Sequence, residues 1–365
     1  MPPRRLMPAC GATPFCSSPP PTVMTPSSTE SDVERVRARQ GMYVLGGTTA
    51  EGLWHTLLEL VGNSFDQFLA GAATRISVEV DDRWATVEDD GDGMPVELIE
   101  PAFMKFHQTA TLDGHQPHVH LRSDALGIGV VIVNALAERL EIETRRNGVA
   151  HAAAFSRGKL VEPLRALGPT TARGTRVRFQ FDEEIFTDGV RYDLEAVRTA
   201  LQTLAWLSPK LDLRFQGESL QKTEGPAGWL RELAPNLVAS TVLSGFGSVD
   251  GVDVEVAFGW QRRSSAPVVK AFVNYGETDD AESSNRRGLI SAVRTYVRAK
   301  RGSKEMTAHD GLVAVVNVGL IDPKFGGPTK ARLEMKGVEK AVHQVVMRTI
   351  NSSPQWWTRL HEAMR

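Results

Sequence analysis

Residues 53–70 have the apolar period of an α-helix. At 100° per residue, one face carries only apolar side chains that would be buried in the protein: Leu57, Val61, Phe65 and Phe68. The opposite face carries only polar side chains: His55, Glu59, Asn63 and Asp66. Such a face is most often solvated, so the pattern alone leaves a chemical role open. A T-T-A-E capping box at Thr48 predicts the start of the helix.

Alternation of apolar and polar residues predicts strands around this helix. Residues 74–80 alternate, and 84–88 returns as the partner strand after a short turn. Residues 175–179 alternate in the same way, 211–215 is a closing strand, and 130–140 and 194–207 are predicted helices. Elements in this order favour an α/β sandwich, in which helices cover one face of a mostly antiparallel sheet.

A polar, glycine-containing passage at 217–228 separates a second region. This region has predicted strands at 252–260, 268–275 and 312–320, and predicted helices at 291–300 and 338–350. Residues 1–33 hold 8 of the 20 prolines and 9 serines and threonines, which is typical of a disordered tail. The predicted organisation is a tail at 1–33, a first domain at 34–222 and a second α/β domain at 223–365.

Composition fits a globular protein with two domains. The 365 residues are 41% hydrophobic and 24% charged, and the net charge is −2. This charge gives no global reason to bind nucleic acid, so any DNA contact would be local. No apolar run approaches the roughly 20 residues of a membrane span, so no membrane association is expected. Both cysteines, Cys10 and Cys16, lie in the tail, which predicts a reducing, cytoplasmic location.

Glycine-rich and acidic turns follow the central helix. VEDDGDGMP (87–95) is a strand that runs into a D-x-G-x-G turn, and GIG (127–129) precedes an apolar helix. These segments resemble the GHKL, or Bergerat-fold, ATPases, together with VRARQGMYV (36–44), ELVGNSFDQFLAG (59–71), DGLVAVVNV (310–318) and DPKFGGPTKARL (322–333). Within that family the resemblance is to the ATPase half of bacterial gyrase B, part of a type IIA topoisomerase. It implies a Bergerat α/β sandwich followed by a transducer domain with a left-handed βαβ crossover.

The adenine side of the implied ATP site lies at the D-x-G-x-G turn. A carboxylate at a strand end can accept a hydrogen bond from an exocyclic amine, and the resemblance implies that Asp89 reads adenine in this way. Gly91 and Gly93 would let the backbone approach the base, and Met94 completes this side. Thr175 matches the family's threonine beside the adenine. An Asp–Gly turn is common by itself, but the preceding strand and helix favour nucleotide binding.

The phosphate side lies on the polar face of the central helix. ATP hydrolysis needs a metal and a group that orients water, and the chain has no Walker loop. Glu59 is the predicted general base, and His55, one turn earlier, would hydrogen-bond to it and orient it. Asn63 would offer its amide oxygen to Mg²⁺, a hard cation that prefers oxygen ligands. Asp66 would bond to other groups in the site.

Further segments complete the resemblance. Gly127 and Gly129 stand before a helix whose N-terminal amides would cradle phosphate. Lys330, in GGPTK, matches the lysine with which the family's transducer reaches the γ-phosphate. Residues 96–126 correspond to the lid that closes over nucleotide. The lid also holds H-x-x-H-x-H at 115–120, for which a zinc site is the alternative, although no second element supplies ligands.

Basic residues crowd one segment of the second domain. Within 286–304 there are no acids and seven basic side chains, including Arg286, Arg287, Arg294, Arg298 and Arg301. A basic helix face is often only solvated. In a dimeric clamp it would instead line the hole that DNA enters, through phosphate contacts. The sequence leaves both interpretations open.

The main hypothesis is an Mg²⁺-dependent ATPase clamp that forms a homodimer on ATP, as the ATPase part of a type IIA topoisomerase-like system. DNA and gyrase-type cleavage subunits are its expected partners. Only 35 residues follow Lys330, so strand passage is not expected of this chain alone. The alternative is a non-catalytic nucleotide-binding regulator or gyrase-interacting paralogue. Gly62, Asp92 and Asp124, which depart from the family pattern, and a tail without tyrosine favour this alternative.

Overall fold

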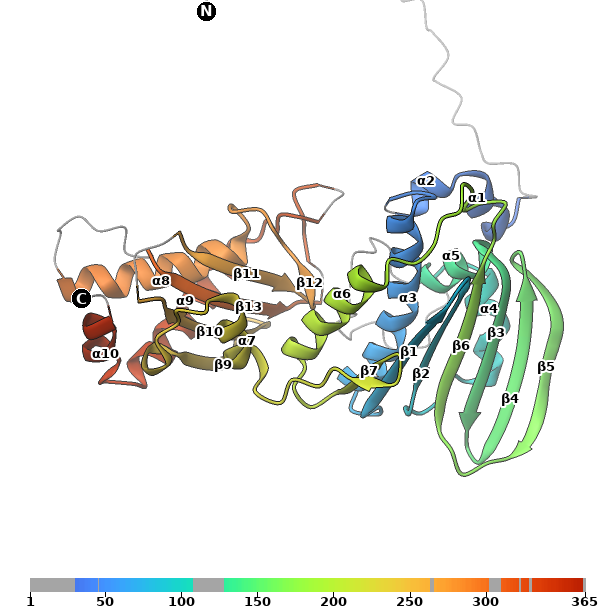
Figure 1. Cartoon of the computed structure of the whole chain (residues 1–365), viewed down its shortest axis with the longest axis horizontal. Coiled ribbons are helices and arrows are strands. Elements are labelled where there is room, and N and C mark those ends of the chain that lie inside the picture. The colour runs from blue at the N-terminus through green and yellow to red at the C-terminus, as the bar shows by residue number, and fades with distance from the viewer. Residues whose placement is uncertain are drawn as a thin grey trace, which may run out of the picture. The chain divides into compact units, whose positions relative to one another are not determined.

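The computed structural model describes most of the chain after residue 29 (Figure 1). The described residues are 30–44, 46–107, 128–262, 266–301, 310–321, 323–327 and 330–363. Those from Ser31 onward belong to a single unit, Ser31–Arg365. Most of the predicted tail, and residues 108–127 of the predicted lid, lie outside them, so those predictions stay open.

The first half is built on an eight-stranded sheet in the order β5-β4-β3-β6-β2-β1-β7-β8. Its strands are β1 (Arg75–Asp81), β2 (Trp84–Asp89), β3 (Ala137–Arg146), β4 (Val149–Ser156), β5 (Lys159–Pro169), β6 (Gly174–Phe181), β7 (Asp212–Phe215) and β8 (Glu218–Ser219). All neighbouring pairs are antiparallel except β1 and β7. The prediction of a mostly antiparallel sheet is therefore confirmed.

Helices cover one face of this sheet. They are α1 (Asp32–Ala38), α2 (Gln40–Tyr43), α3 (Ala50–Leu69), α4 (Val96–Met104), α5 (Gly129–Ala135) and α6 (Leu194–Leu207). The apolar residues predicted for the buried face of α3 reach the core, where Leu57, Val61 and Phe65 are almost completely buried. β2 alternates between buried and half-buried positions along its whole length, so every second side chain packs under α3.

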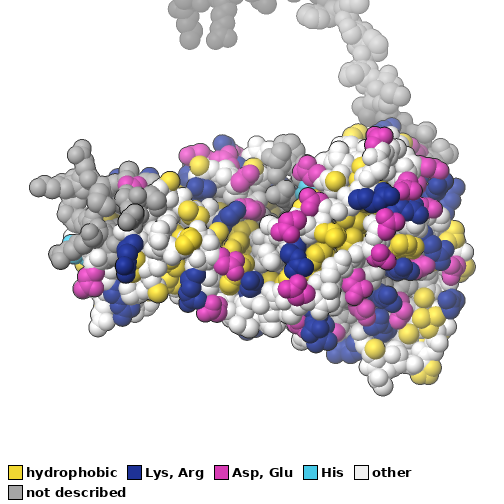
Figure 2. Space-filling view, in the orientation of Figure 1, with side chains coloured by type: hydrophobic (Ala, Val, Ile, Leu, Met, Phe, Trp, Pro, Cys, Tyr) yellow, Lys and Arg dark blue, Asp and Glu magenta, His cyan; other side chains and the backbone are white. Residues whose placement is uncertain are grey.

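The other face of the sheet carries charged side chains in cross-strand pairs. Arg145 lies 2.7 Å from Glu88, and Arg178 lies 3.6 Å from Glu141. Charges of both signs are interspersed over the visible face of the molecule (Figure 2). The visible face of the molecule therefore shows no large patch of only positive or only negative charge, as the small net charge suggests.

Two local predictions are wrong. The helix predicted at 130–140 ends at Ala135, and β3 begins at Ala137. A short apolar run has no period that separates a buried helix from a buried strand, and here Leu140 and Ile142 point into the core from a strand. The central helix is capped at Thr49 rather than Thr48, and no side chain caps it.

The second half is built on a five-stranded sheet in the order β12-β11-β13-β10-β9. Its elements are α7 (Gly225–Leu233), η1 (Ala239–Thr241), β9 (Leu243–Val249), β10 (Val252–Trp260), β11 (Val268–Val273), β12 (Gly276–Glu277), α8 (Ser284–Arg301), β13 (Leu312–Gly319), α9 (Lys336–Asn351) and α10 (Trp356–Ala363). β11 and β13 are parallel neighbours connected through α8, which is the predicted βαβ unit. The left hand of this crossover stays a prediction.

The two halves share a small apolar core. Trp206 of α6 stacks on Trp229 of α7, with ring centroids 6.4 Å apart, and Trp229 lies 5.8 Å from Phe272 of β11. α8 and α9 cover the opposite face of the five-stranded sheet. The boundary predicted between 222 and 223 falls between β8 and α7 and remains a proposal. Among the described helices, none is long and apolar enough to cross a membrane.

Candidate functional site

Asp89 ends β2 as a buried carboxylate with only 4% of its surface exposed. Its Oδ2 accepts a hydrogen bond from Ser64 Oγ at 2.8 Å, and its Oδ1 accepts from the amides of Gly91 at 3.0 Å and Thr175 at 3.3 Å. Burial raises the pKa of this carboxyl, although the three hydrogen bonds act in the opposite direction. A carboxylate has about four acceptor positions, so Asp89 can accept one further donor.

The D-x-G-x-G turn is held close to the neighbouring strands. A Cβ on Gly93, whose φ is +76°, would lie 2.6 Å from the carbonyl oxygen of Arg145, so this position requires glycine. The amide of Met94 donates to Thr175 Oγ1 at 3.1 Å, and Thr144 Oγ1 donates to the carbonyl of Met94 at 2.9 Å. The structure therefore brings the predicted adenine-side residues together around Asp89.

The four polar residues predicted on α3 have different environments. Asn63 is exposed, Glu59 and Asp66 are half-buried, and His55 is buried. His55 Nε2 lies 3.6 Å from a carboxylate oxygen of Glu51, one turn earlier on the helix. The four side chains are therefore not equally accessible, and the orienting role of His55 toward Glu59 stays a prediction.

Glu59 faces the first residue of α5. A Cβ on Gly129 would lie 2.2 Å from Glu59 Oε2, so a larger residue here would displace the Glu59 carboxylate. The predicted general base and one of the predicted phosphate-cradling glycines are thus neighbours. The other glycine, Gly127, and the departure at Asp124 lie outside the described residues.

An open groove of about 640 Å³ lies beside the D-x-G-x-G turn, where Asp92, Arg146 and Arg173 line it. Arg146 donates to the carbonyl of Gly93 at 2.9 Å, and Arg173 pairs with Asp92. The sequence interpretation missed these arginines and Ser64, the donor to Asp89. Ser64 stands next to Asn63, but no local signal shows that it meets a strand end 25 residues away.

Lys330 and its loop are only partly described. The amide of Lys330 donates to the carbonyl of Gly327 at 3.3 Å, and its Nζ lies 5.7 Å from the ring centroid of Phe325. Pro328 and Thr329 lie outside the described residues. Contact between Lys330 and a γ-phosphate stays a prediction.

The five arginines predicted to face DNA do not form one free surface. Arg287 pairs with Glu339 at 2.9 Å and with Glu282 at 3.6 Å. Arg286 is half-buried against β11. Arg294 and Arg298 are exposed on α8, and the side chain of Arg301 lies outside the described residues. The basic face described on α8 is therefore narrower than predicted.

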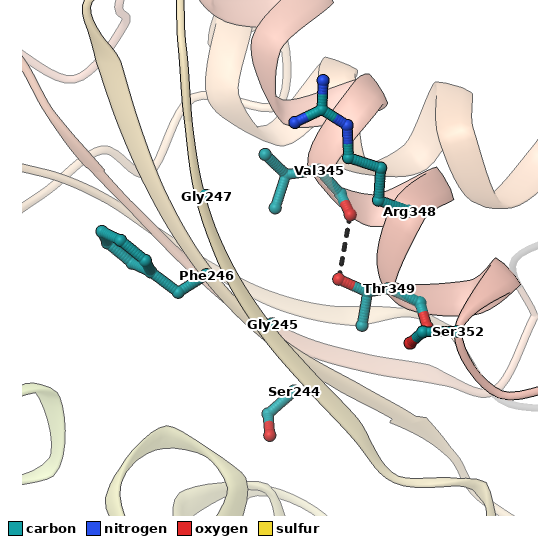
Figure 3. A pocket seen from close by; sticks show the side chains of 8 residues that line it. All are labelled: Ser244, Gly245, Phe246, Gly247, Val345, Arg348, Thr349 and Ser352. Carbon is teal, nitrogen blue, oxygen red and sulfur yellow. Dashed lines mark hydrogen bonds between the residues drawn. The ribbon is translucent and has the colours of Figure 1, made fainter.

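A second groove lies between β9 and α9, far along the chain from Asp89 and Glu59 (Figure 3). Thr349 Oγ1 donates to the carbonyl of Val345 at 2.9 Å. A Cβ on Gly245 would lie 2.0 Å from Thr349 Oγ1, so glycine permits close packing of helix and strand here. The close packing of helix and strand accounts for this groove, and we assign no ligand to it.

The donor set fits ATP and Mg²⁺ in kind. Asp89 retains an acceptor position, and close-packed glycines border it and Glu59. Asn63 and Asp66 add oxygen atoms, which Mg²⁺ prefers. Among the described residues, no group of three or more His, Cys, Asp and Glu is arranged to hold a metal. The histidines at 115, 118 and 120, considered for zinc, lie outside them.

The chain matches two families in succession. Residues 48–185 match the family described as histidine kinase-, DNA gyrase B-, and HSP90-like ATPase. Residues 225–360 match the DNA gyrase B family.

Several relatives are similar over most of this chain. The DNA gyrase B protein of Thermus thermophilus is 35% identical over 341 residues, which cover 86% of this chain and 53% of the relative. The B subunit of DNA topoisomerase 4 from Mycoplasma genitalium is 30% identical over 346 residues, with the same two coverages. The chain thus spans about half the length of these relatives.

Solved structures extend the similarity to the fold. The 43K ATPase domain of Thermus thermophilus gyrase B, in complex with an aminocoumarin, superposes with a TM-score of 0.76 at 31% identity. That match covers 91% of this chain and 93% of the other. The ATP-binding domain of Francisella tularensis topoisomerase IV gives 0.71 at 26% identity, covering 91% and 95%. With its site built around Asp89 and α3, the chain belongs to the gyrase B-like branch of the GHKL ATPases.

Proposed function

We propose that this chain binds and hydrolyses ATP as the ATPase and transducer part of a type IIA topoisomerase-like clamp. The observation that carries the proposal is the buried Asp89 carboxylate at the end of β2, which accepts three hydrogen bonds and retains an acceptor position. A buried carboxylate prepared for one more donor suits the exocyclic amine of adenine. The gyrase B relatives support the same assignment.

Five of the predicted residues have direct roles in the proposed reaction. Asp89 accepts the amine of adenine, and Thr175 and Met94 fix the turn beside it. Asn63 would hold Mg²⁺, which neutralises phosphate charge when bound. A Glu59 carboxylate oxygen takes a proton from the attacking water. The water oxygen then bonds to the γ-phosphorus, while the bond from that phosphorus to the departing ADP oxygen breaks.

Lys330 and the dimer extend this proposal. Lys330 would make a charge-assisted contact with the γ-phosphate, a group that ADP lacks, and only such a differential contact can shift a conformational equilibrium. ATP would then draw the transducer toward the nucleotide site and favour the homodimer. DNA would contact the exposed Arg294 and Arg298, and gyrase-type cleavage subunits would supply strand passage. A cytoplasmic location belongs to the same proposal.

Sedimentation tests the clamp. The wild type and Lys330→Ala are compared without nucleotide, with ADP and with a non-hydrolysable ATP analogue. We expect the wild type to dimerise only with the analogue and Lys330→Ala to stay monomeric. A wild type that stays monomeric with saturating analogue defeats the clamp. A Lys330→Ala dimer that still needs the analogue keeps the clamp and rejects the lysine as its sensor.

A specific observation favours a second candidate function, a nucleotide-binding regulator with little turnover. Asp92, which departs from the family's arginine, lies in the D-x-G-x-G turn and pairs with Arg173, and Gly62 departs from the family's aspartate. ATP binding without hydrolysis at any protein concentration, with or without DNA, would favour the regulator. Hydrolysis that rises faster than protein concentration would favour the dimeric clamp.

A further inference from the structure

One hairpin turn in the second half differs from the others. Five two-residue turns between described strands have positive φ at both positions, and four of them carry glycine second: Asn147–Gly148, Arg157–Gly158, Gln216–Gly217 and Asp250–Gly251. The fifth, Asn274–Tyr275 between β11 and β12, has φ values of 46° and 66°. Glycine accepts this left-handed conformation freely, whereas a bulky side chain is strained in it. Tyr275 therefore occupies its position against the backbone preference.

The side chain of Tyr275 reaches the catalytic helix. Its ring meets the ring of Phe65 edge to face, with centroids 4.8 Å apart. Phe65 is fully buried on α3, between Asn63 and Asp66, so the contact lies directly behind the proposed metal and phosphate side. Burial, together with the charge of Glu255, raises the pKa of Tyr275 to about 12, so its hydroxyl stays protonated at neutral pH. A strained aromatic residue thus joins the second half to α3.

The tip of this hairpin is firmly held. Asn274 Nδ2 donates to the carbonyl of Leu320 at 2.8 Å, and Asn274 Oδ1 accepts from the amide of Leu320 at 2.8 Å. The amide of Tyr275 donates to Asn317 Oδ1 at 3.3 Å. These bonds fix the backbone from which the Tyr275 ring projects, so the ring can act as a rigid support.

The base of the hairpin is tied to the segment that follows Lys330. Thr278 Oγ1 and the carbonyl of Phe272 both accept from Asn285 Nδ2 at the start of α8, at 3.2 and 3.0 Å. Beside them, Ser283 Oγ accepts from the amide of Leu333 at 3.0 Å. The hairpin, the start of α8 and the segment after Lys330 therefore form one hydrogen-bonded unit.

We infer that Tyr275 is a positioning residue for the catalytic helix. Its ring supports α3 through Phe65 and so aligns Glu59 and Asn63, and the unit that supplies this support also carries Lys330. The inference rests on the proposed ATPase function, because alignment matters only if Glu59 reacts. It also explains why a strained tyrosine stands where the other turns have glycine.

Tyr275→Gly tests the contact between the Tyr275 and Phe65 rings without disturbing the turn, because glycine accepts the turn conformation and removes the ring. Asp250→Gly is the control, since it also replaces a residue of positive φ by glycine, here at the first position of the exposed turn between β9 and β10. Tyr275→Phe keeps the ring and removes the hydroxyl. Two readouts are compared in the full chain: kcat and KM for ATP, and hydrogen–deuterium exchange of the peptide that covers 63–66. Tyr275→Asn, which also accepts the turn, replaces Tyr275→Gly if that variant does not fold.

We expect Tyr275→Gly to lower kcat about ten- to a hundredfold with KM unchanged, the effect of a misaligned site, and to speed exchange at 63–66. Tyr275→Phe and Asp250→Gly should leave both readouts near wild type. Unchanged kcat and exchange in Tyr275→Gly would overturn the inference, as would faster exchange over the whole chain. A wild type that hydrolyses no ATP would defeat the proposed function, while the exchange readout still decides whether Tyr275 supports α3.

Discussion

Two carboxylates, one in each half of the molecule, are both poorly hydrated but differ in the hydrogen bonds that they accept. Asp89 is buried at the end of β2, and Glu255 is half-buried on β10, beside Asn317 in the register of the sheet. Burial raises the pKa of both. Asp89 accepts three hydrogen bonds, whereas within the described part of the chain no residue donates one to Glu255.

Hydrogen bonds compensate Asp89 for its burial, whereas the burial of Glu255 is unfavourable. At Asp89 the protein supplies donors from α3, from its own turn and from β6, which stabilise a charge while one acceptor position stays open. At Glu255 burial removes water, and within the described part of the chain no residue donates a hydrogen bond in its place. Burial of a charged group is costly unless it is hydrogen-bonded. Only the first arrangement suits the proposed nucleotide site, and three changes can test this contrast.

Removal of the predicted base should have the largest effect. Glu59→Ala should abolish hydrolysis while leaving ATP binding nearly intact, because loss of a general base typically costs about 10²–10⁴-fold in rate. Steady-state phosphate release and ATP calorimetry would measure the two effects separately. Glu195→Ala, at an exposed position in the first turn of α6, is the control and should keep the wild-type rate. Equal rates for Glu59→Ala and wild type would remove Glu59 from the mechanism.

Asp89→Asn tests the prepared site with a smaller expected effect. The new amide presents donors where the adenine amine needs an acceptor, so ATP binding should weaken by about ten- to a hundredfold, the cost of about 1–3 kcal/mol for an unpaired buried group. Asp90→Asn is the matched control. The Asp90 carboxylate bonds to the amides of Thr74 and Arg75 rather than facing Ser64. Calorimetry that shows equal ATP affinity for Asp89→Asn and wild type would place adenine elsewhere.

The sequence predicted the nucleotide half better than the contacts between halves, for a physical reason. Asp89, Gly91, Gly93 and Met94 lie within one turn, so their short-range pattern already contains most of the proposed adenine side. The short turn after the alternating residues 74–80 also predicted β2, as their partner strand, to within one residue. The same local signal failed after Ala135, where a short apolar run changes from helix to strand.

The remaining contacts depend on residues that are distant in sequence. Ser64 meets Asp89 only because α3 packs over β2, and Phe65 meets Tyr275 only because the two halves associate. His55 was placed on a polar face by its helical spacing, but neighbouring elements bury it. The helical period predicts the direction in which a side chain points. It does not predict which residues of other elements pack against that side chain. In the second half, β10 has the predicted bounds, but α8 begins at Ser284 rather than at 291, and β9 was not predicted.

Glu255→Gln tests the unfavourable carboxylate and should have the smallest effect. Because the folded-state pKa of Glu255 is raised from its ordinary value of 4.5, its protonated form favours folding. That contribution is complete below pH 4.5 and is lost as pH rises through the raised pKa, so the charged group opposes folding at neutral pH. Glu255→Gln should therefore be more stable than wild type near pH 7.5, by at most about 1 kcal/mol, and the gain should shrink toward about pH 4.5. Urea unfolding at both pH values measures this, with Glu79→Gln on the exposed side of β1 as the control. If the gain in stability is equal at both pH values, or if Glu79→Gln shows the same gain, then the charge of Glu255 does not destabilise the folded protein. The contrast between Glu255 and Asp89 would then fail.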